Sequence, residues 1–201
     1  EDLFYQMVHR LERVGELSKE TVFLDGPKLE ACANKYTFVW KKSVGKWEEK
    51  MFIKIQEAVR LVNQEFIQSF RVGTEYRVQD LRKICRFLEE ICRERNIEFV
   101  HGRGKRKSIE QRYLELFQRY LERQITYDWH TASFQGRNNY CKTDPDATFM
   151  HMKDDHMRNA QLKPGYNVQI GVDSEYIVAV DIFKDRNDVW TLVPFLKRMK
   201  E

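Results

Sequence analysis

The sequence has few of the residues that would indicate a secreted, membrane-bound or zinc-binding protein. Only four cysteines occur among 201 residues, and none of them forms a C-x-x-C pair. A zinc knuckle is therefore not expected, and the pattern is typical of a reducing compartment. The chain lacks an apolar run of about 18 residues, the length that spans a bilayer, and no signal peptide is visible. We therefore expect a cytoplasmic protein without a membrane span.

A large excess of charge of one sign is also absent. The net charge is +4 and the pI is about 8.8, which mildly favours a polyanionic partner. Hydrophobic residues make up 42% of the chain, so a core can be buried. The length suits one domain, or one domain with an appendage. Because the first residue is Glu1 rather than Met, we expect a processed chain or a piece of a longer one.

A short apolar run that ends in an acid stands near the beginning. Thr21 to Leu24 is rich in β-branched and aromatic residues and is followed by Asp25, Gly26 and Pro27. This pattern predicts a strand whose last carboxylate lies at the edge of a sheet. Asp25 either caps the turn that follows, which is the commoner role of such a residue, or binds a divalent metal ion.

Helical periodicity dominates two parts of the chain. Residues 3–16 have apolar residues on one face and predict a helix. From about Lys50 to Ile125, three apolar stripes with steps of three and four predict three helices that pack on each other like a coiled coil. Breaks are expected at 71–76 and 101–107. Ser108 has the spacing of a capping box and should begin the third helix.

Basic residues occur beside aromatic residues just after the Asp25 turn. Residues 36–40 alternate as in a strand, with Lys35, Lys41 and Lys42 around them. Such a pattern binds single-stranded or distorted DNA; a half-buried strand with solvated lysines at its ends is the alternative, and the residues alone favour it.

A second basic group lies in the loop between the second and third predicted helices. It contains Arg103, Lys105, Arg106 and Lys107, which would bind phosphates in a salt-dependent way. A solvated turn explains the same residues equally well.

The last third of the chain predicts an irregular stretch, a hairpin and a helix. Residues 126–139 are polar, and 163–165 predict a turn. Residues 166–172 and 176–183 predict an antiparallel hairpin, with the second strand apolar enough to be central. Asp173 should lie in the hairpin turn, and Asp188 should cap the final helix.

A group of acids and histidines precedes that hairpin. It consists of His151, Asp154, Asp155 and His156. Its spacing is not a standard zinc pattern, so a metal site is not favoured. Lys153, His156 and Arg158 are better interpreted as contacts to DNA phosphates or as structural residues.

Two segments resemble bacterial insertion-sequence DDE transposases, in the branch with a helical insertion after the first strand. One is residues 25–42, DGPKLEACANKYTFVWKK, and the other is residues 142–170, which begins KTDPDATFM. The resemblance covers nearly the whole chain. One departure is Pro27, where the family usually has a hydroxyl residue; proline has no backbone N–H to donate.

The resemblance implies an α+β chain with the first half of a ribonuclease-H-like fold. Residues 21–47 and 140–201 would form that part, after a leading helix within 1–20. Residues 48–127 would be the helical insertion, and 128–139 a polar connection. Asp25 would be the first catalytic and metal-binding carboxylate, with Mg²⁺ or Mn²⁺ as cofactor. We expect the chain to end before the family's second catalytic Asp and its Glu.

The implied function is DNA transposition by DNA-end binding, strand cleavage and strand transfer. The partners would be transposon ends and a second copy of the chain, in the bacterial cytoplasm at the nucleoid. The resemblance implies an enzyme, although this chain alone is expected to be inactive because two carboxylates are missing. One alternative is a non-catalytic remnant that binds DNA or the intact transposase. A helical interaction module is another.

Overall fold

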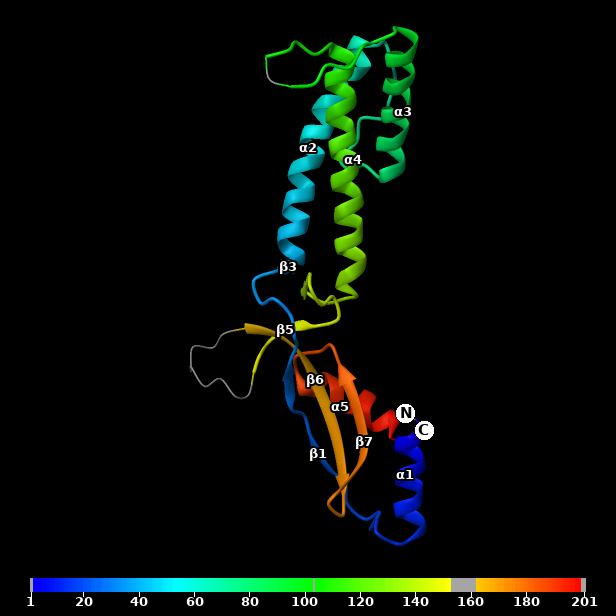
Figure 1. Ribbon diagram of the computed structural model, residues 1–201, viewed down its shortest axis with the longest axis vertical. Helices are drawn as coiled ribbons and strands as arrows, with labels where there is room; N and C mark the ends of the chain where they lie inside the picture. The colour runs from blue at the N-terminus through cyan, green and yellow to red at the C-terminus, as the bar shows by residue number, and fades with distance from the viewer. Residues whose placement is uncertain (1, 103, 153–161, 200–201) are drawn as a thin grey trace. The chain divides into compact units, whose positions relative to one another are not determined.

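The computed structural model describes residues 2–102, 104–152 and 162–199 (Figure 1). It has mixed α+β secondary structure, and its chain forms two compact units. The helical unit comprises Trp40–Gln135. The sheet unit comprises Glu1–Val39 and Gly136–Glu201. The expected residues Lys153, Asp154, Asp155, His156 and Arg158 lie outside the described residues.

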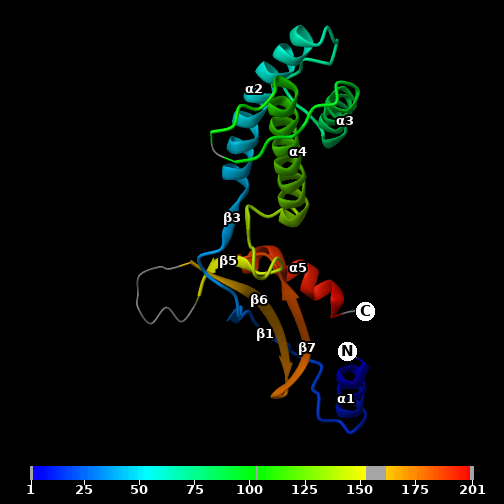
Figure 2. The same ribbon diagram turned by 45° about the horizontal axis from the view of Figure 1, so that its top comes forward.

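The helical unit contains the three predicted helices. They are α2 (Lys41–Glu65), α3 (Val78–Glu94) and α4 (Ile109–Phe134). Helix α4 packs against both α2 and α3 (Figure 2). The predicted stripes supply the core, in which Ile55, Leu88 and Phe117 have no exposed surface. Burial of these apolar faces makes three helices stable together that would be marginal alone.

The boundaries of these helices differ from the predicted ones at both ends of the unit. Helix α2 begins at Lys41, nine residues before the predicted Lys50, so Lys41 and Lys42 are helical. The prediction of an irregular stretch at 126–139 is wrong for its first nine residues, because α4 continues to Phe134. Phe134 is buried at 2% exposure, which gives the polar stretch an apolar anchor. The N-cap at Ser108 is confirmed: its hydroxyl accepts a hydrogen bond from Gln111 N at 3.1 Å.

The sheet unit is organised around one long strand, β6 (Leu162–Asp173). Four strands pair with it antiparallel: β1 (Phe23–Asp25), β2 (Lys28–Glu30), β5 (Thr148–His151) and β7 (Tyr176–Phe183). Since Ile170 pairs with both Asp25 and Val180, β1 and β7 lie on opposite sides of β6. A separate two-stranded sheet joins β3 (Phe38–Trp40) to β4 (Asn139–Cys141).

Two expectations about the strands of this unit need correction. The β6–β7 hairpin is confirmed, but β6 is the central strand rather than β7. Residues 163–165 do not form a turn; they lie within β6, where the Pro164 carbonyl accepts a hydrogen bond from Ala31 N at 2.8 Å. Proline is tolerated there because its carbonyl still pairs although it has no N–H.

Two helices complete the sheet unit, α1 (Asp2–Arg13) and α5 (Asp188–Arg198). Helix α5 packs on β6, and its Phe195 is buried against Phe183 of β7. Its N-cap is Asn187, whose side chain accepts a hydrogen bond from Val189 N; Asp188 is the first helical residue, not the cap. None of the helices in the described residues is long and apolar enough to cross a bilayer.

Candidate metal and DNA sites

Asp25 is the last residue of β1, as the sequence predicted. It pairs with Ile170 of the central strand and its side chain is exposed. The Oδ1 atom accepts a hydrogen bond from the backbone N–H of Gly26 at 2.8 Å. This hydrogen bond supports the turn-capping interpretation, and the metal interpretation stays a prediction.

The turn after Asp25 fits closely over two buried amide side chains. A Cβ on Gly26 would lie 2.5 Å from Nε2 of Gln169, so only glycine fits here without a shift. Gln169 Nε2 donates to Asn167 Oδ1 at 3.0 Å, and Asn167 Nδ2 donates to Asp188 Oδ1 at 2.9 Å. These hydrogen bonds link Gln169, which lies against Gly26, to the first residue of α5.

Sequence reasoning missed Gln169 and Asn167. A signal was present, because two amides alternate with apolar residues in the strand 166–172. Both are buried, at 5% and 0% exposure, and buried amides need hydrogen-bond partners.

At Pro27 the chain departs from the family pattern. This residue joins the turn to the central strand through its carbonyl group. That oxygen accepts a hydrogen bond from Val168 N at 2.9 Å. The missing N–H therefore does not prevent the turn from joining the central strand, and β2 begins directly afterwards at Lys28.

Two other acids of the sheet unit have structural partners. Asp173 ends β6 instead of lying in the hairpin turn, and it is 3% exposed. It accepts hydrogen bonds from the Ser18 hydroxyl at 2.7 Å and from Lys19 N at 2.9 Å. These bonds, the Ser18 hydroxyl foremost, hold its pKa below the usual value of 3.8. Asp181 in β7 is paired with Arg198.

Within the described ranges, no group of three or more His, Cys, Asp and Glu side chains is arranged to hold a metal ion. Asp25 therefore belongs to no such group among those residues. A lone carboxylate would bind Mg²⁺ weakly, because Mg²⁺ keeps most of its water ligands and needs further oxygens.

The lysines near the aromatic segment lie in two places. Lys35 is in the loop between β2 and β3, with its Nζ 5.3 Å from the centroid of the exposed Tyr36 ring. Lys41 and Lys42 are exposed in the first turn of α2. That turn contains no acidic residue, and the N-cap Trp40 makes no side-chain capping bond. The N-terminus of a helix carries partial positive charge, so these lysines add to a positive potential that attracts phosphates.

The basic loop before α4 is only partly available for DNA. Lys105 and Arg106 are exposed. Lys107 is engaged by Glu115, with Nζ 2.6 Å from Oε2 and 2.9 Å from Oε1. Arg103 lies outside the described residues.

Comparisons with known proteins identify no relative: no family model, no curated protein and no solved structure matches the chain.

Proposed function

We propose that this chain forms the first half of the ribonuclease-H-like catalytic domain of a DDE transposase. The supporting observation is the strand arrangement around Asp25: β1 ends in this acid and pairs antiparallel with β6 of the β6–β7 hairpin, and a helix packed on β6 follows the hairpin. This is the order that the resemblance to the family leads us to expect. Two short strands of the same sheet, β2 and β5, come between β1 and the hairpin in the chain. Residues 40–135 would be the helical insertion of that branch.

The pairing of β1 is a second supporting observation. Among the described residues, β1 pairs with β6 and with no other strand. In a ribonuclease-H-like domain, the strand that carries the second acid lies beside the first strand. The pairing of β1 is compatible with such a strand.

Asp25 would hold one of two divalent ions in the complete enzyme. Such ions activate the attacking water or 3′-hydroxyl and stabilise the leaving oxygen of the phosphodiester. The role of this chain is to fix the position of the Asp25 carboxylate through the Gly26 turn and its amide support. With one carboxylate, the 201-residue chain by itself is expected not to cut DNA.

The test is to follow Mn²⁺ binding at Asp25 by NMR. Mn²⁺ should broaden the amide signals of Asp25, Gly26 and the cross-strand Ile170, weakly and at millimolar concentration. Asp25→Asn should abolish the broadening because it removes the charge and keeps the shape. Glu30→Gln is the matched control, since Glu30 is an exposed acid on the neighbouring strand, where it pairs with Lys163. Broadening that survives in Asp25→Asn would contradict the proposal.

A second candidate function is DNA binding without catalysis, and the first turn of α2 favours it. Two lysines at an uncapped helix N-terminus are unusual, because their charge opposes the helix dipole. The double variant Lys41→Ala/Lys42→Ala should bind DNA more weakly in EDTA. The slope of log K against log salt concentration should become shallower by roughly 0.7–0.9 for each lost phosphate contact. Lys54→Ala, in the middle of the same helix, is the control; equal loss from both variants would argue against this surface.

A further inference from the structure

Helix α5 is apolar on two opposite sides. Thr191 and Phe195 face the sheet and are buried, at 0% and 1% exposure. The side away from the sheet carries four exposed apolar residues at helical spacing, which we call the outer stripe: Val189 (74% exposed), Trp190 (69%), Val193 (58%) and Leu196 (41%). Because residues three and four apart share one side of a helix, the outer stripe is continuous along α5.

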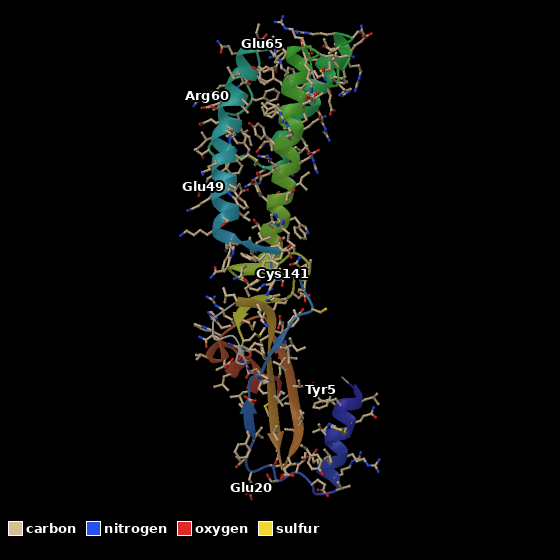
Figure 3. All side chains as sticks on the ribbon, turned by 60° about the vertical axis from the view of Figure 1, so that its left-hand side comes forward. Tyr5, Glu20, Glu49, Arg60, Glu65 and Cys141 are labelled. Atoms are coloured by element: carbon tan, nitrogen blue, oxygen red, sulfur yellow. The ribbon has the colours of Figure 1, made fainter. Side chains whose placement is uncertain are left out.

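An outward helix side normally carries polar residues. Helix α2 has charged residues there, such as Glu49 and Arg60, which point away from α4 (Figure 3). The outer stripe of α5 departs from this rule, and a helix that is apolar all round is normally buried all round. Its most exposed large ring belongs to Trp190, and tryptophan is enriched among the residues that dominate binding at protein interfaces. We therefore expect another protein surface to cover the outer stripe.

The two ends of α5 differ in charge. Asp188 lies in the first turn, and Lys197 and Arg198 lie in the last. Asp185 and Arg186, just before the helix, offset each other, and Arg198 is paired within its own chain. An identical helix in antiparallel orientation brings the acidic start of each copy to the same end as the basic last turn of the other. The surface is thus complementary to itself in charge and in apolar character, as a twofold contact requires.

We propose that the outer stripe is a docking surface for a second copy of this chain, with the two α5 helices antiparallel across a twofold axis at Val193. Trp190 and Leu196 lie three residues to either side of Val193, roughly 4.5 Å along the helix. The axis therefore places Trp190 of each copy against Leu196 of the other. Helix α5 has only 11 residues, so the contact is small and the dimer is weak, with a dissociation constant in the micromolar range. The inference rests on α5 and not on the proposed function.

Sedimentation equilibrium of the 201-residue chain measures the dimer. Trp190→Ala should raise the dissociation constant at least tenfold because it removes the largest side chain of the contact. The circular dichroism spectrum should stay unchanged, since this ring is already exposed in the single chain. Trp47→Ala is the matched control: Trp47 is 57% exposed in α2, and its loss should leave dimerisation unchanged.

Cysteine substitutions locate the axis. They are made in a Cys32→Ser background, because Cys32 is exposed and the other three cysteines are buried. Val193→Cys should form a disulfide-linked dimer on oxidation, since facing Cα atoms of two packed helices come within roughly 5 Å. Val189→Cys is the control on the same stripe. Its two copies would be about 12 Å apart along the helices, too far for a disulfide.

The outcomes are distinct. A chain that stays monomeric at millimolar concentration would overturn the proposal. A dimer that Trp190→Ala leaves intact would also overturn it and would assign the self-association to another surface, as would equal weakening by Trp47→Ala. Oxidation that links Val189→Cys as fast as Val193→Cys would contradict the antiparallel axis.

Discussion

The helical unit and the sheet unit differ in how their buried and exposed apolar residues are arranged. In the helical unit, Val59, Leu88 and Phe117 have no exposed surface and belong to one contiguous core. In the sheet unit, Ile182 of β7 is 62% exposed and Trp190 of α5 is 69% exposed. The helical unit also exposes single apolar side chains, such as Ile53 at 60% and Ile67 at 91%, but its apolar stripes close on one core. The exposed apolar residues of the sheet unit include neighbours on one face of its sheet.

The geometry of the two units explains this difference. Three amphipathic helices can turn all their apolar stripes toward a common axis. A sheet has two faces, and here α5 packs on one side of β6 through Phe195. Val180 and Ile182 pair with Ile170 and Val168 on the other face, and both are exposed. A sheet normally needs a layer on each apolar face, so we expect further protein to cover the sheet unit when it functions.

The largest expected effect tests whether the helical core is as complete as its burial indicates. Phe117→Ala should lower the free energy of unfolding by about 3–5 kcal/mol, because it removes a buried ring and leaves a cavity. Ile182→Ala should change it by less than about 0.5 kcal/mol, because that side chain is already in water. Urea unfolding followed by circular dichroism measures both. Similar losses for the two variants would show that Ile182 is covered in solution.

Two glycine-to-alanine substitutions should have smaller effects on the free energy of unfolding, with opposite signs in the two units. A Cβ on Gly165 of β6 would lie 2.7 Å from the Leu29 backbone oxygen and would also meet the Met152 methyl group. Gly165→Ala should therefore cost about 1–3 kcal/mol. Gly45 lies inside α2 with nothing within 4 Å of its Cβ position. Gly45→Ala should stabilise the helical unit by about 0.5–1 kcal/mol.

The same urea experiment measures both glycine variants. A destabilising Gly45→Ala would indicate that this face of α2 has a partner in solution. A neutral Gly165→Ala would mean that β2 can move away from the central strand.

The same comparison explains how much of the fold could be predicted from the sequence. Helices depend on local periodicity, so the stripes containing Ile55, Leu88 and Phe117 located all three helices, and Ser108 located the start of one. The end of α4 was missed because residues 126–133 are mostly polar and show no apolar stripe, although Tyr127 and Phe134 anchor them. The start of α2 was missed because Lys41 and Lys42 are unfavourable in a first helical turn.

The sheet depends on pairing between distant residues, which no local pattern contains. The hairpin of β6 and β7 was predictable because its strands are adjacent in sequence. The central position of β6 was not, since it depends on pairing with β1 and β2, far away in the chain. Of the candidate site, the strand end at Asp25 was predicted, but the supporting amides Asn167 and Gln169 require knowledge of what lies against Gly26.

The smallest expected effect is the pH dependence of stability that comes from two carboxylates, Asp173 of the sheet unit and Glu115 of the helical unit. Asp173→Asn keeps the shape and one acceptor oxygen but loses the charge that the Ser18 hydroxyl and the Lys19 N–H stabilise. Because the folded-state pKa of Asp173 is depressed, its contribution is complete above the usual value of 3.8 and is lost as the pH falls through the lower folded value. The stability difference between the wild type and Asp173→Asn should therefore be constant from pH 7 to 5 and shrink below about pH 4.

Glu115→Gln is the counterpart in the helical unit. The Lys107 amine lowers the pKa of Glu115, with a further hydrogen bond from Gln111. Its contribution has the same sign: it is complete above the usual value of 4.5 and is lost as the pH falls through the lower folded value. Urea midpoints at pH 7, 5 and 3 for both variants measure the two contributions. Asp173 joins β6 to residues before β1, whereas Glu115 joins α4 to the residue before its N-cap. One outcome is a stability difference from the wild type that shrinks in acid for Asp173→Asn alone. In that case the charge of Asp173 stabilises the contact between β6 and the residues before β1, and the charge of Glu115 does not stabilise the start of α4. A stability difference between the wild type and Asp173→Asn that grows in acid would contradict the depressed pKa of Asp173.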